Sequence, residues 1–259
     1  MKTKYPIILV HGAGFRDIAY FKSFGRIDKN LKEEGYIVYR SKIDAFGTIE
    51  DNAIFLKKEI DHILEVEKTD KINIIAHSKG GLDSKYLITD LGMEDKVASL
   101  TTLCTPHRGS IIATKILKFP KWMLKFAAFW IDFWYRLGGD KKPNSYEVCK
   151  ELKKIDNIND EAMNISDKVY CQSFSTTLKK SKDDFVMGIP LMFSHYFQEQ
   201  STDGVVSKDS SIFGDYKGEC IDDSISHTQI VDFMANKKKR QKVYAFYSAL
   251  CKDLSNKGF

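Results

Sequence analysis

The chain has 259 residues, of which 43% are hydrophobic, and a formal net charge of +5 at pH 7. This length suits one large domain, and no apolar stretch reaches the roughly 20 residues that a membrane-spanning helix needs. The positive charge is mild and no basic stripe is interleaved with aromatic residues, which argues against a nucleic-acid partner. Five cysteines without a C-x-x-C pair predict reduced, mostly buried thiols rather than a disulfide framework.

The N-terminal segment carries positive charge from Lys2 and Lys4, but the apolar run that follows spans only residues 7–10. This run is too short for the hydrophobic part of a signal peptide. We therefore expect a cytoplasmic protein or one associated with a membrane surface, and a secreted protein only if a leader has been removed.

Short apolar runs alternate with helical patterns, which predicts an α/β fold with a mostly parallel sheet and helices on both faces. From Ile49 the apolar residues follow one helical stripe, and Thr48 with Asp51 form a plausible capping pair at its start. A second helix is expected after Ser78, and a long final helix over about 228–254. The expected strands are 7–10, 36–39, 72–76, 97–103, about 169–175 and about 212–221.

The segment from about 110 to 165 shows helical pattern but no convincing strand. Its centre is an amphipathic, aromatic helix, whose stripe could pack into the core, form a dimer contact, cover an apolar site or meet lipid. The segment alone leaves these alternatives open. With no repeat or linker elsewhere, the sequence predicts one domain, 1–259, with this helical insertion. The stripe comprises Trp122, Phe126, Phe129, Phe133 and Leu137, flanked by Trp130 and Trp134.

A serine, Ser78, lies at the junction between the expected strand 72–76 and the next helix, in the run Ala-His-Ser-Lys-Gly. This run matches the nucleophile pattern G-x-S-x-G with alanine in the first position. Small residues at Ala76 and Gly80 would let the strand and the helix approach closely while the turn exposes the hydroxyl. Ser78 is therefore either a helix cap or a nucleophile.

A nucleophilic serine needs a base and an orienting acid, which follow it in the order acid, then histidine. His227 lies between an expected strand and the final helix, a loop position that suits a base. His195 has no such placement and is interpreted as structural or as part of the rim. Asp203 precedes a glycine in a turn, whereas the other late aspartates fall in less turn-like or more exposed contexts.

Two backbone N–H groups would stabilise the oxyanion formed in acyl transfer. The first belongs to Lys79, which follows Ser78 and would act through its backbone only. The second belongs to Ala13, in the glycine-rich turn after the first strand, where His11 would have a structural role. This turn lacks the spacing of a phosphate-binding loop.

Four stretches resemble the bacterial lipases of the α/β-hydrolase fold: YPIILVHGAG, INIIAHSKGGLDSKYLI, LTTLCTPHRGS, and STDGVVS followed by SHTQIVDF. The resemblance covers most of the chain, and Thr105–Ser110 is a particularly specific block. It implies a triad of Ser78, Asp203 and His227, with the N–H groups of Ala13 and Lys79 as the oxyanion hole. It also places the insertion where such lipases carry their lid. The lid and acyl-chain contacts would be Trp122, Phe126, Phe129, Trp130 and Phe133.

Secreted lipases of this kind often hold calcium near the catalytic histidine, partly through an aspartate two residues after it. That position is Gln229 here, so no calcium site of this design is expected, and no other metal or cofactor. The resemblance implies a serine carboxylic-ester hydrolase, a lipase that cleaves acylglycerols or other fatty-acyl esters, with a lipid interface as a candidate contact. The alternatives are a short-chain esterase, thioesterase or acyltransferase with the same triad, and a non-catalytic lipid-binding scaffold.

Overall fold

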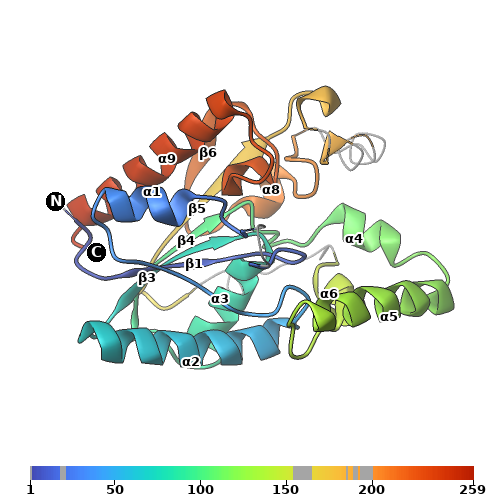
Figure 1. Cartoon of the computed structure of the whole chain (residues 1–259), viewed down its shortest axis with the longest axis horizontal. Coiled ribbons are helices and arrows are strands. Elements are labelled where there is room, and N and C mark those ends of the chain that lie inside the picture. Colours follow the sequence, from blue (N-terminus) through green and yellow to red (C-terminus); the bar gives the residue numbers. More distant parts are fainter. Residues whose placement is uncertain (1, 18–21, 154–164, 185, 189–191, 193–200) are drawn as a thin grey trace.

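The computed structural model describes residues 2–17, 22–153, 165–184, 186–188, 192 and 201–259. Its centre is a six-stranded parallel sheet in the order β2-β1-β3-β4-β5-β6 (Figure 1). All six strands lie near their expected positions, although β6 begins after 212 because Gly214, with a φ of 55°, turns the chain first. The strands are β1 (Ile7–Val10), β2 (Val38–Arg40), β3 (Ile72–His77), β4 (Val97–Leu103), β5 (Tyr170–Thr177) and β6 (Asp215–Ser224).

Alternate residues of the buried strands supply two hydrophobic cores, one on each face of the sheet. Ile8 and Val10 face α2 and α3, whereas Ile7 and Leu9 face α1 and α9. Figure 1 shows the two pairs of helices on opposite sides of the sheet. Of the five cysteines expected to be mostly buried, Cys104 and Cys251 are buried and the other three are partly exposed. These helices are α1 (Ile27–Glu33), α2 (Ile49–Glu67), α3 (Lys79–Thr89) and α9 (Lys237–Asn256).

The start of α2 agrees with the sequence prediction, whereas the start of α9 does not. The capping pair predicted for α2 is confirmed, because Thr48 accepts a hydrogen bond from the N–H of Asp51. The final helix expected over 228–254 is wrong at its start. Asp232 and Met234 have φ values of 60° and 54°, a left-handed conformation that interrupts a helix, so α9 begins only at its cap Asn236.

The insertion between β4 and β5 is helical, as expected, and lies beyond the carboxyl ends of the central strands (Figure 1). Residues 154–164 of the expected insertion lie outside the described residues. The insertion comprises α4 (Ile111–Ile116), α5 (Lys121–Leu137) and α6 (Ser145–Glu151). The short remaining elements are η2 (Ser181–Asp183), α8 (Lys208–Ser211) and η3 (Gln229–Val231).

A buried ion pair lies within the first turns of α3, and a hydrogen bond links it to α2. The ammonium of Lys79 lies 2.6 Å from a carboxylate oxygen of Asp83, and both side chains are about 1% exposed. The amide of Asn52 on α2 donates to the other oxygen at 3.0 Å. The Lys79 side chain therefore has a structural role that was not predicted, because it neutralises a carboxylate that has no access to water. That Lys79 serves the oxyanion hole through its backbone N–H alone stays a prediction.

Burial raises the pKa of Asp83 to about 6, whereas the charge of Lys79 acts in the opposite direction. Since this pKa lies above that of the unfolded chain, ionisation of Asp83 lowers stability as pH rises from about 4 to about 6. Loss of the ammonium would raise the pKa further and extend this window to higher pH.

We expect Lys79→Met to lower the free energy of unfolding by about 3–5 kcal/mol at pH 8, because an unpaired carboxylate stays buried. The loss should shrink at pH 5, where Asp83 takes up a proton. Urea denaturation at both pH values measures it. The double variant Lys79→Met/Asp83→Asn is the control and should recover most of the loss; a single variant as stable as the parent at pH 8 would contradict the role of the pair.

Candidate active site

β3 ends in a sharp turn that carries Ser78. This residue has φ 54° and ψ −132°, a conformation that costs a non-glycine residue free energy and persists only when its surroundings impose it. The Ser78 side chain makes no capping hydrogen bond to α3, so the helix-cap interpretation is wrong. Its hydroxyl instead donates to Nε2 of His227, with the two atoms 2.8 Å apart.

The turn is possible because two glycines permit very close contacts. A Cβ atom at Gly80 would lie 2.5 Å from the carbonyl oxygen of His11, so the requirement for a small residue two positions after the serine is confirmed. A Cβ atom at Gly12 would lie 2.5 Å from Cβ of Ser78. The loop after β1 is therefore held directly against the serine.

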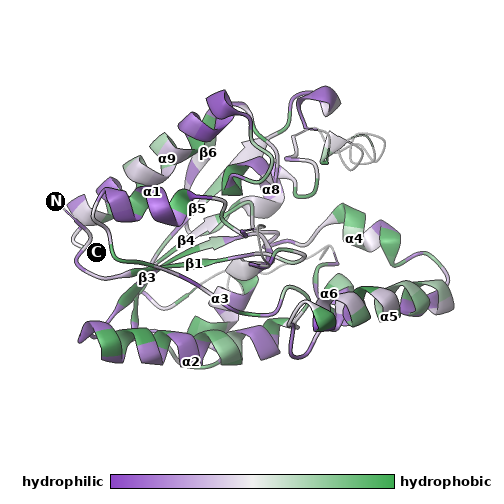
Figure 2. Ribbon diagram, viewed as in Figure 1, coloured by the Kyte–Doolittle hydropathy of each residue, from purple (hydrophilic) through white to green (hydrophobic). Residues whose placement is uncertain are grey.

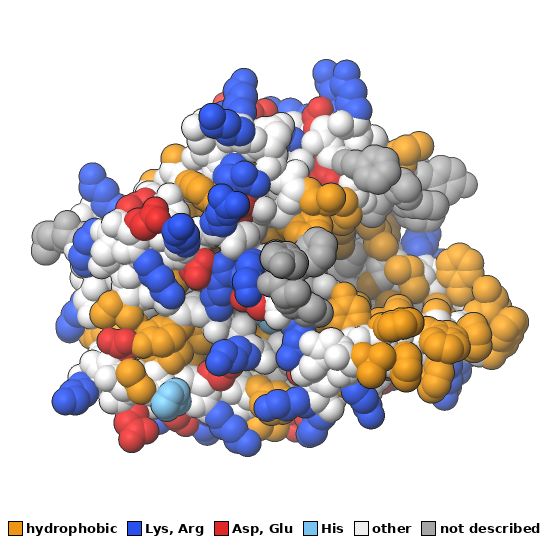
Figure 3. Space-filling view, viewed as in Figure 1, with side chains coloured by type: hydrophobic (Ala, Val, Ile, Leu, Met, Phe, Trp, Pro, Cys, Tyr) orange, Lys and Arg blue, Asp and Glu red, His pale blue; other side chains and the backbone are white. Residues whose placement is uncertain are grey.

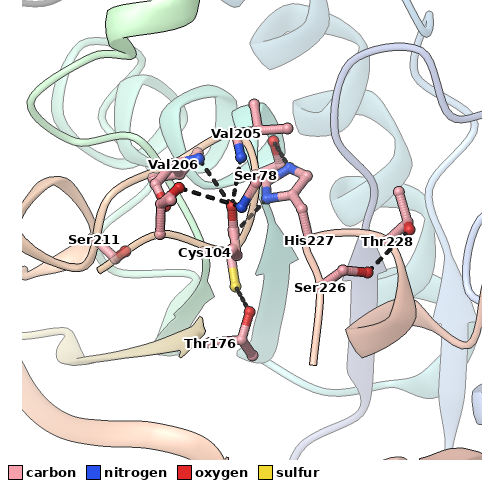
Figure 4. A network of polar contacts seen from close by, with 12 residues as sticks. Ser78, Cys104, Thr176, Val205, Val206, Ser211, Ser226, His227 and Thr228 are labelled. Carbon is pink, nitrogen blue, oxygen red and sulfur yellow. Dashed lines mark hydrogen bonds and ion pairs between the residues drawn. The ribbon is translucent and has the colours of Figure 1, made fainter. Parts of the chain in front are cut away.

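His227 and Asp203 complete a hydrogen-bonded chain with Ser78. Nδ1 of His227 donates to a carboxylate oxygen of Asp203 at 2.6 Å, and both side chains are buried. The other Asp203 oxygen accepts the N–H groups of Val205 and Val206 at 2.9 and 2.8 Å (Figure 4). Asp203 therefore uses both oxygens, one to orient the imidazole and one to fix its own turn.

A second histidine, His77, orients the backbone of His227. Its Nε2 donates to the carbonyl oxygen of His227 at 2.8 Å. Burial, followed by the proximity of His227, lowers the pKa of His77 well below its usual range, so the ring is neutral. No role was predicted for His77 from the sequence, although its place directly before Ser78 was a usable signal.

Cys104 lies beside the same group (Figure 4). Ligand atoms of Cys104, Asp203 and His227 lie within 4.8 Å of one another, which is close enough for a metal. However, burial and the charge of Asp203 raise the pKa of the Cys104 thiol well above its usual range. A thiolate is the form that binds metals, so the chemistry of this trio favours the hydrogen-bonded chain over a metal centre.

The loop after β1 carries Ala13, which lines the same cavity as Ser78. His11 donates from Nδ1 to the carbonyl oxygen of Gly12 at 3.1 Å, the structural role expected of it. The phenol of Tyr135, on α5, donates to the carbonyl oxygen of Gly14 at 2.8 Å. The loop is thus fixed both by its own histidine and by the inserted helices.

An apolar cavity of about 320 Å³ begins at Ser78 and extends beneath the insertion. The wall from α5 consists of Leu124, Ala127, Ala128 and Ile131. The five residues expected to contact an acyl chain do not line this cavity and are 42–72% exposed, so that expectation is corrected. The smaller apolar residues lie on a different side of α5 from the aromatic ones and line the cavity, with Ala128 buried and Ala127 and Ile131 exposed at its rim. The corrected residues are Trp122, Phe126, Phe129, Trp130 and Phe133.

The loop that carries His227 is clamped by an ammonium group from α9. Nζ of Lys239 donates to Oε1 of Gln229 at 2.8 Å and to the carbonyl oxygen of Asp183 at 3.1 Å. The Gln229 amide also donates to the Asp183 carbonyl at 3.0 Å. A single cation therefore joins η2, η3 and α9 around the histidine loop.

The residues around this loop do not fit a calcium ion, which prefers several carboxylate and carbonyl oxygens. The position after His227 that the resemblance singled out carries the neutral amide of Gln229, already bonded to Lys239. The nearby carboxylate, Asp184, accepts from the hydroxyls of Ser226 and Thr228 through one oxygen and from two backbone N–H groups through the other. His195 lies outside the described residues.

The sequence pattern of the palmitoyl protein thioesterase family matches residues 6–233. Triacylglycerol lipase 2 of Saccharomyces cerevisiae is 27% identical over 90% of this chain and 73% of its own length. A triacylglycerol lipase of Vibrio cholerae is 34% identical over 43% of this chain, and the matched part spans only 36% of that relative. Among solved structures, lipase 1 from Pelosinus fermentans superimposes with a TM-score of 0.67 at 17% identity, covering 98% of this chain and 99% of its own.

The solved structure supports the fold, and the expected α/β-hydrolase architecture is confirmed. The family match covers most of the chain, including the serine turn, the Asp203 turn and the histidine loop. The chain therefore belongs to the palmitoyl protein thioesterase family, among the lipases of the α/β-hydrolase fold.

Proposed function

We propose that this chain is a serine hydrolase that cleaves fatty-acyl esters of lipids, with Ser78, His227 and Asp203 as its catalytic triad. One observation carries the proposal: the hydrogen-bonded chain from Asp203 through His227 to Ser78 ends at an apolar cavity of about 320 Å³. The relatives named as triacylglycerol lipases support a lipid ester as the substrate class.

In this mechanism the Ser78 hydroxyl attacks the ester carbonyl while Nε2 of His227 takes its proton. Asp203 holds the imidazole with Nδ1 protonated and stabilises the imidazolium that forms. His227 then protonates the leaving alcohol. Water, deprotonated by His227, hydrolyses the acyl-enzyme and releases the fatty acid.

The oxyanion would lie between the N–H groups of Lys79 and Ala13. Lys79 opens α3, whose N-terminus carries partial positive charge. Ala13 lies on the loop that Gly12 holds against Ser78. Loss of one such donor typically costs on the order of 10² to 10³ in rate.

The acyl chain would occupy the cavity beneath α4, α5 and α6. These helices form its roof, which supports a lid or cover role for the insertion. The wall near Ser78 includes Val205 and Val206, the residues whose N–H groups hold Asp203. The acyl chain would thus pack against the same turn that orients the catalytic acid.

We expect Ser78→Ala to reduce hydrolysis of p-nitrophenyl esters about 10⁴-fold or more, because it removes the nucleophile and leaves the fold intact. A fluorophosphonate probe should label the parent and not the variant, since labelling needs an activated serine. Thermal melting of both proteins checks the fold. Turnover in a pure, folded Ser78→Ala preparation would overturn the assignment, and an unlabelled parent would favour a non-catalytic lipid-binding scaffold.

A palmitoyl thioester is a second candidate substrate, favoured by the family match over residues 6–233. The same triad and cavity would accept it, because attack on a thioester carbonyl needs the same base and oxyanion donors. Palmitoyl-coenzyme A, assayed beside a palmitoyl ester with parent and Ser78→Ala, distinguishes the two. A kcat/KM that is higher for the thioester would make thioesterase the main activity.

We expect Ala128→Trp, at the buried alanine of the cavity wall on α5, to fill part of the cavity and shift the preference towards short acyl chains. Each buried methylene is worth about 0.8 kcal/mol, so excluding two or three would lower kcat/KM for a palmitoyl ester about 10- to 50-fold. The acetyl ester should change by less than about threefold. Ala245→Trp, at an exposed alanine of α9, is the matched control. Equal loss on both esters would place the acyl chain elsewhere.

We expect the ammonium of Lys239 to affect catalysis by holding the loop that positions His227. We expect Lys239→Met to lower kcat about 3- to 30-fold with little change in KM, since a loosened histidine loop impairs proton transfer more than substrate binding. Lys239→Arg should restore part of the activity. Lys238→Met, at an exposed neighbour, should behave like the parent. A calcium chelator that inactivates the parent, or a Lys239→Met variant with unchanged kcat, would contradict this arrangement.

A further inference from the structure

One face of α5 is left uncovered by the rest of the described chain. Nine large hydrophobic side chains of this helix are exposed, and at about 100° per residue eight of them fall within an arc of about 140°. The ninth, Ile131, lies outside this arc and lines the cavity. Soluble proteins rarely expose a contiguous apolar patch of this kind without a partner. Figure 3 shows hydrophobic side chains gathered over α4 and α5. This outer face of α5 consists of Trp122, Met123, Phe126, Phe129, Trp130, Phe133, Trp134 and Leu137.

The opposite side of α5 is firmly attached, so the helix is presented in a defined orientation. Ala128 is buried, and the carboxylate of Asp132 accepts the N–H of Ser145 at 2.8 Å, which fixes α5 to the start of α6. The phenol of Tyr135 reaches the loop after β1. In Figure 2 the hydrophobic and polar residues of α5 alternate along the ribbon, as expected for a two-sided helix.

The charges beside the outer face have one sign. Four basic side chains are exposed there, and none of them forms an ion pair with a carboxylate of the described residues. The single acidic residue of α5, Asp132, is turned inward to Ser145. We call these four residues the basic edge: Lys118, Lys121, Lys125 and Arg136.

We propose that the outer face of α5 docks onto the surface of a bilayer that contains anionic phospholipids. Tryptophan and phenylalanine bury favourably at the boundary between headgroups and acyl chains, and lysine and arginine pair with anionic headgroups. The helix would lie in the plane of the interface. In the described part of the chain, no helix is long and apolar enough to cross a bilayer. The inference goes beyond ester hydrolysis and does not depend on it.

A lipid surface fits this face better than a second copy of the chain. A two-fold dimer would pair the outer face with itself, which brings the two basic edges together and makes them repel. An anionic bilayer offers the opposite charge to the basic edge and an apolar layer to the aromatic side chains. Docking would also place the membrane lipids beside the cavity, because Leu124 and Ile131 line it from the inner side of the same helix.

The test uses vesicle flotation and tryptophan fluorescence with the full chain carrying Ser78→Ala, so that no hydrolysis is needed. All three tryptophans of the protein lie on the outer face, and their emission therefore reports on docking directly. Vesicles of phosphatidylcholine with an equal part of phosphatidylglycerol should shift the emission to the blue, and brominated lipids should quench it. Pure phosphatidylcholine should bind at least 10-fold more weakly.

Three variants in this background make the test specific. Phe126→Ser/Phe129→Ser, which retains every tryptophan, should weaken binding at least 10-fold. Lys121→Glu/Lys125→Glu should remove the preference for phosphatidylglycerol and the decrease of binding with salt. The matched control Ile37→Ser/Val66→Ser removes exposed apolar side chains elsewhere and should bind like the parent. Circular dichroism melting confirms that each variant folds.

Several results would overturn the proposal. An emission maximum unchanged by either vesicle, or equal binding by parent and Phe126→Ser/Phe129→Ser, would exclude docking through this face. A dimer in analytical ultracentrifugation that dissociates in that variant, without vesicle binding, would assign the face to a second copy of the chain. Because the readouts are binding and association, failure here leaves the proposed hydrolysis to be judged by its own assay.

Discussion

A non-glycine residue at φ 54° and ψ −132° is held there only by its surroundings, and the site of this protein depends on that one turn. The N–H of Ser78 donates to the carbonyl of Leu103 on β4 at 2.9 Å, and the hydroxyl of Thr105 donates to the carbonyl of Ser78 at 2.8 Å. The first turn of α3 is anchored from below by the Lys79–Asp83 pair. Parallel strands, a loop and a buried charge pair therefore fix the backbone of Ser78 from three directions, which leaves its hydroxyl free to face His227.

The other half of the proposed triad reaches the serine from a distant part of the chain, so it needs its own support. The N–H of His227 donates to the carbonyl of Asp203 at 3.0 Å, and His77 holds the carbonyl of His227. Lys239 donates to Gln229 and to the carbonyl of Asp183, and the carboxylate of Asp184 accepts two backbone N–H groups. These hydrogen bonds fix the loop. Groups that are already oriented before the reaction need no rearrangement when charge develops, which is how a preorganised site lowers a barrier. In this protein the positive charge that holds the loop is the ammonium of Lys239, a side chain of the protein itself.

The sequence was informative wherever chemistry and spacing restrict the choice. Only His227 follows both Ser78 and Asp203 in the chain, and only Ser78 among the serines has Ala or Gly both two residues before and two residues after it. The residues brought together in space could therefore be named in advance. The sequence could not show which stripe of α5 faces inward, because large aromatic and small apolar stripes are both hydrophobic and helical periodicity alone gives no direction. It also could not show that Lys79 is buried, since lysine is rarely buried unless it is paired. Its partner, Asp83, lies one helical turn away, a spacing that exposed pairs also adopt. The start of α9 was missed because Asp232 and Met234 adopt φ values that no periodicity predicts.

Helix α5 contacts the loop after β1 and also carries the exposed outer face, so it links that face to the site. Tyr135 bonds the carbonyl of Gly14, and Arg16 pairs with Asp140 just beyond the end of α5. Both contacts act on the loop that carries Ala13, the proposed second oxyanion donor. A displacement of α5 would therefore alter the cavity wall and the position of the Ala13 N–H together. The residues that line the cavity, the contacts to the loop after β1 and the outer face thus belong to one helix. A surface that holds the outer face would therefore also hold the loop that carries Ala13 in place.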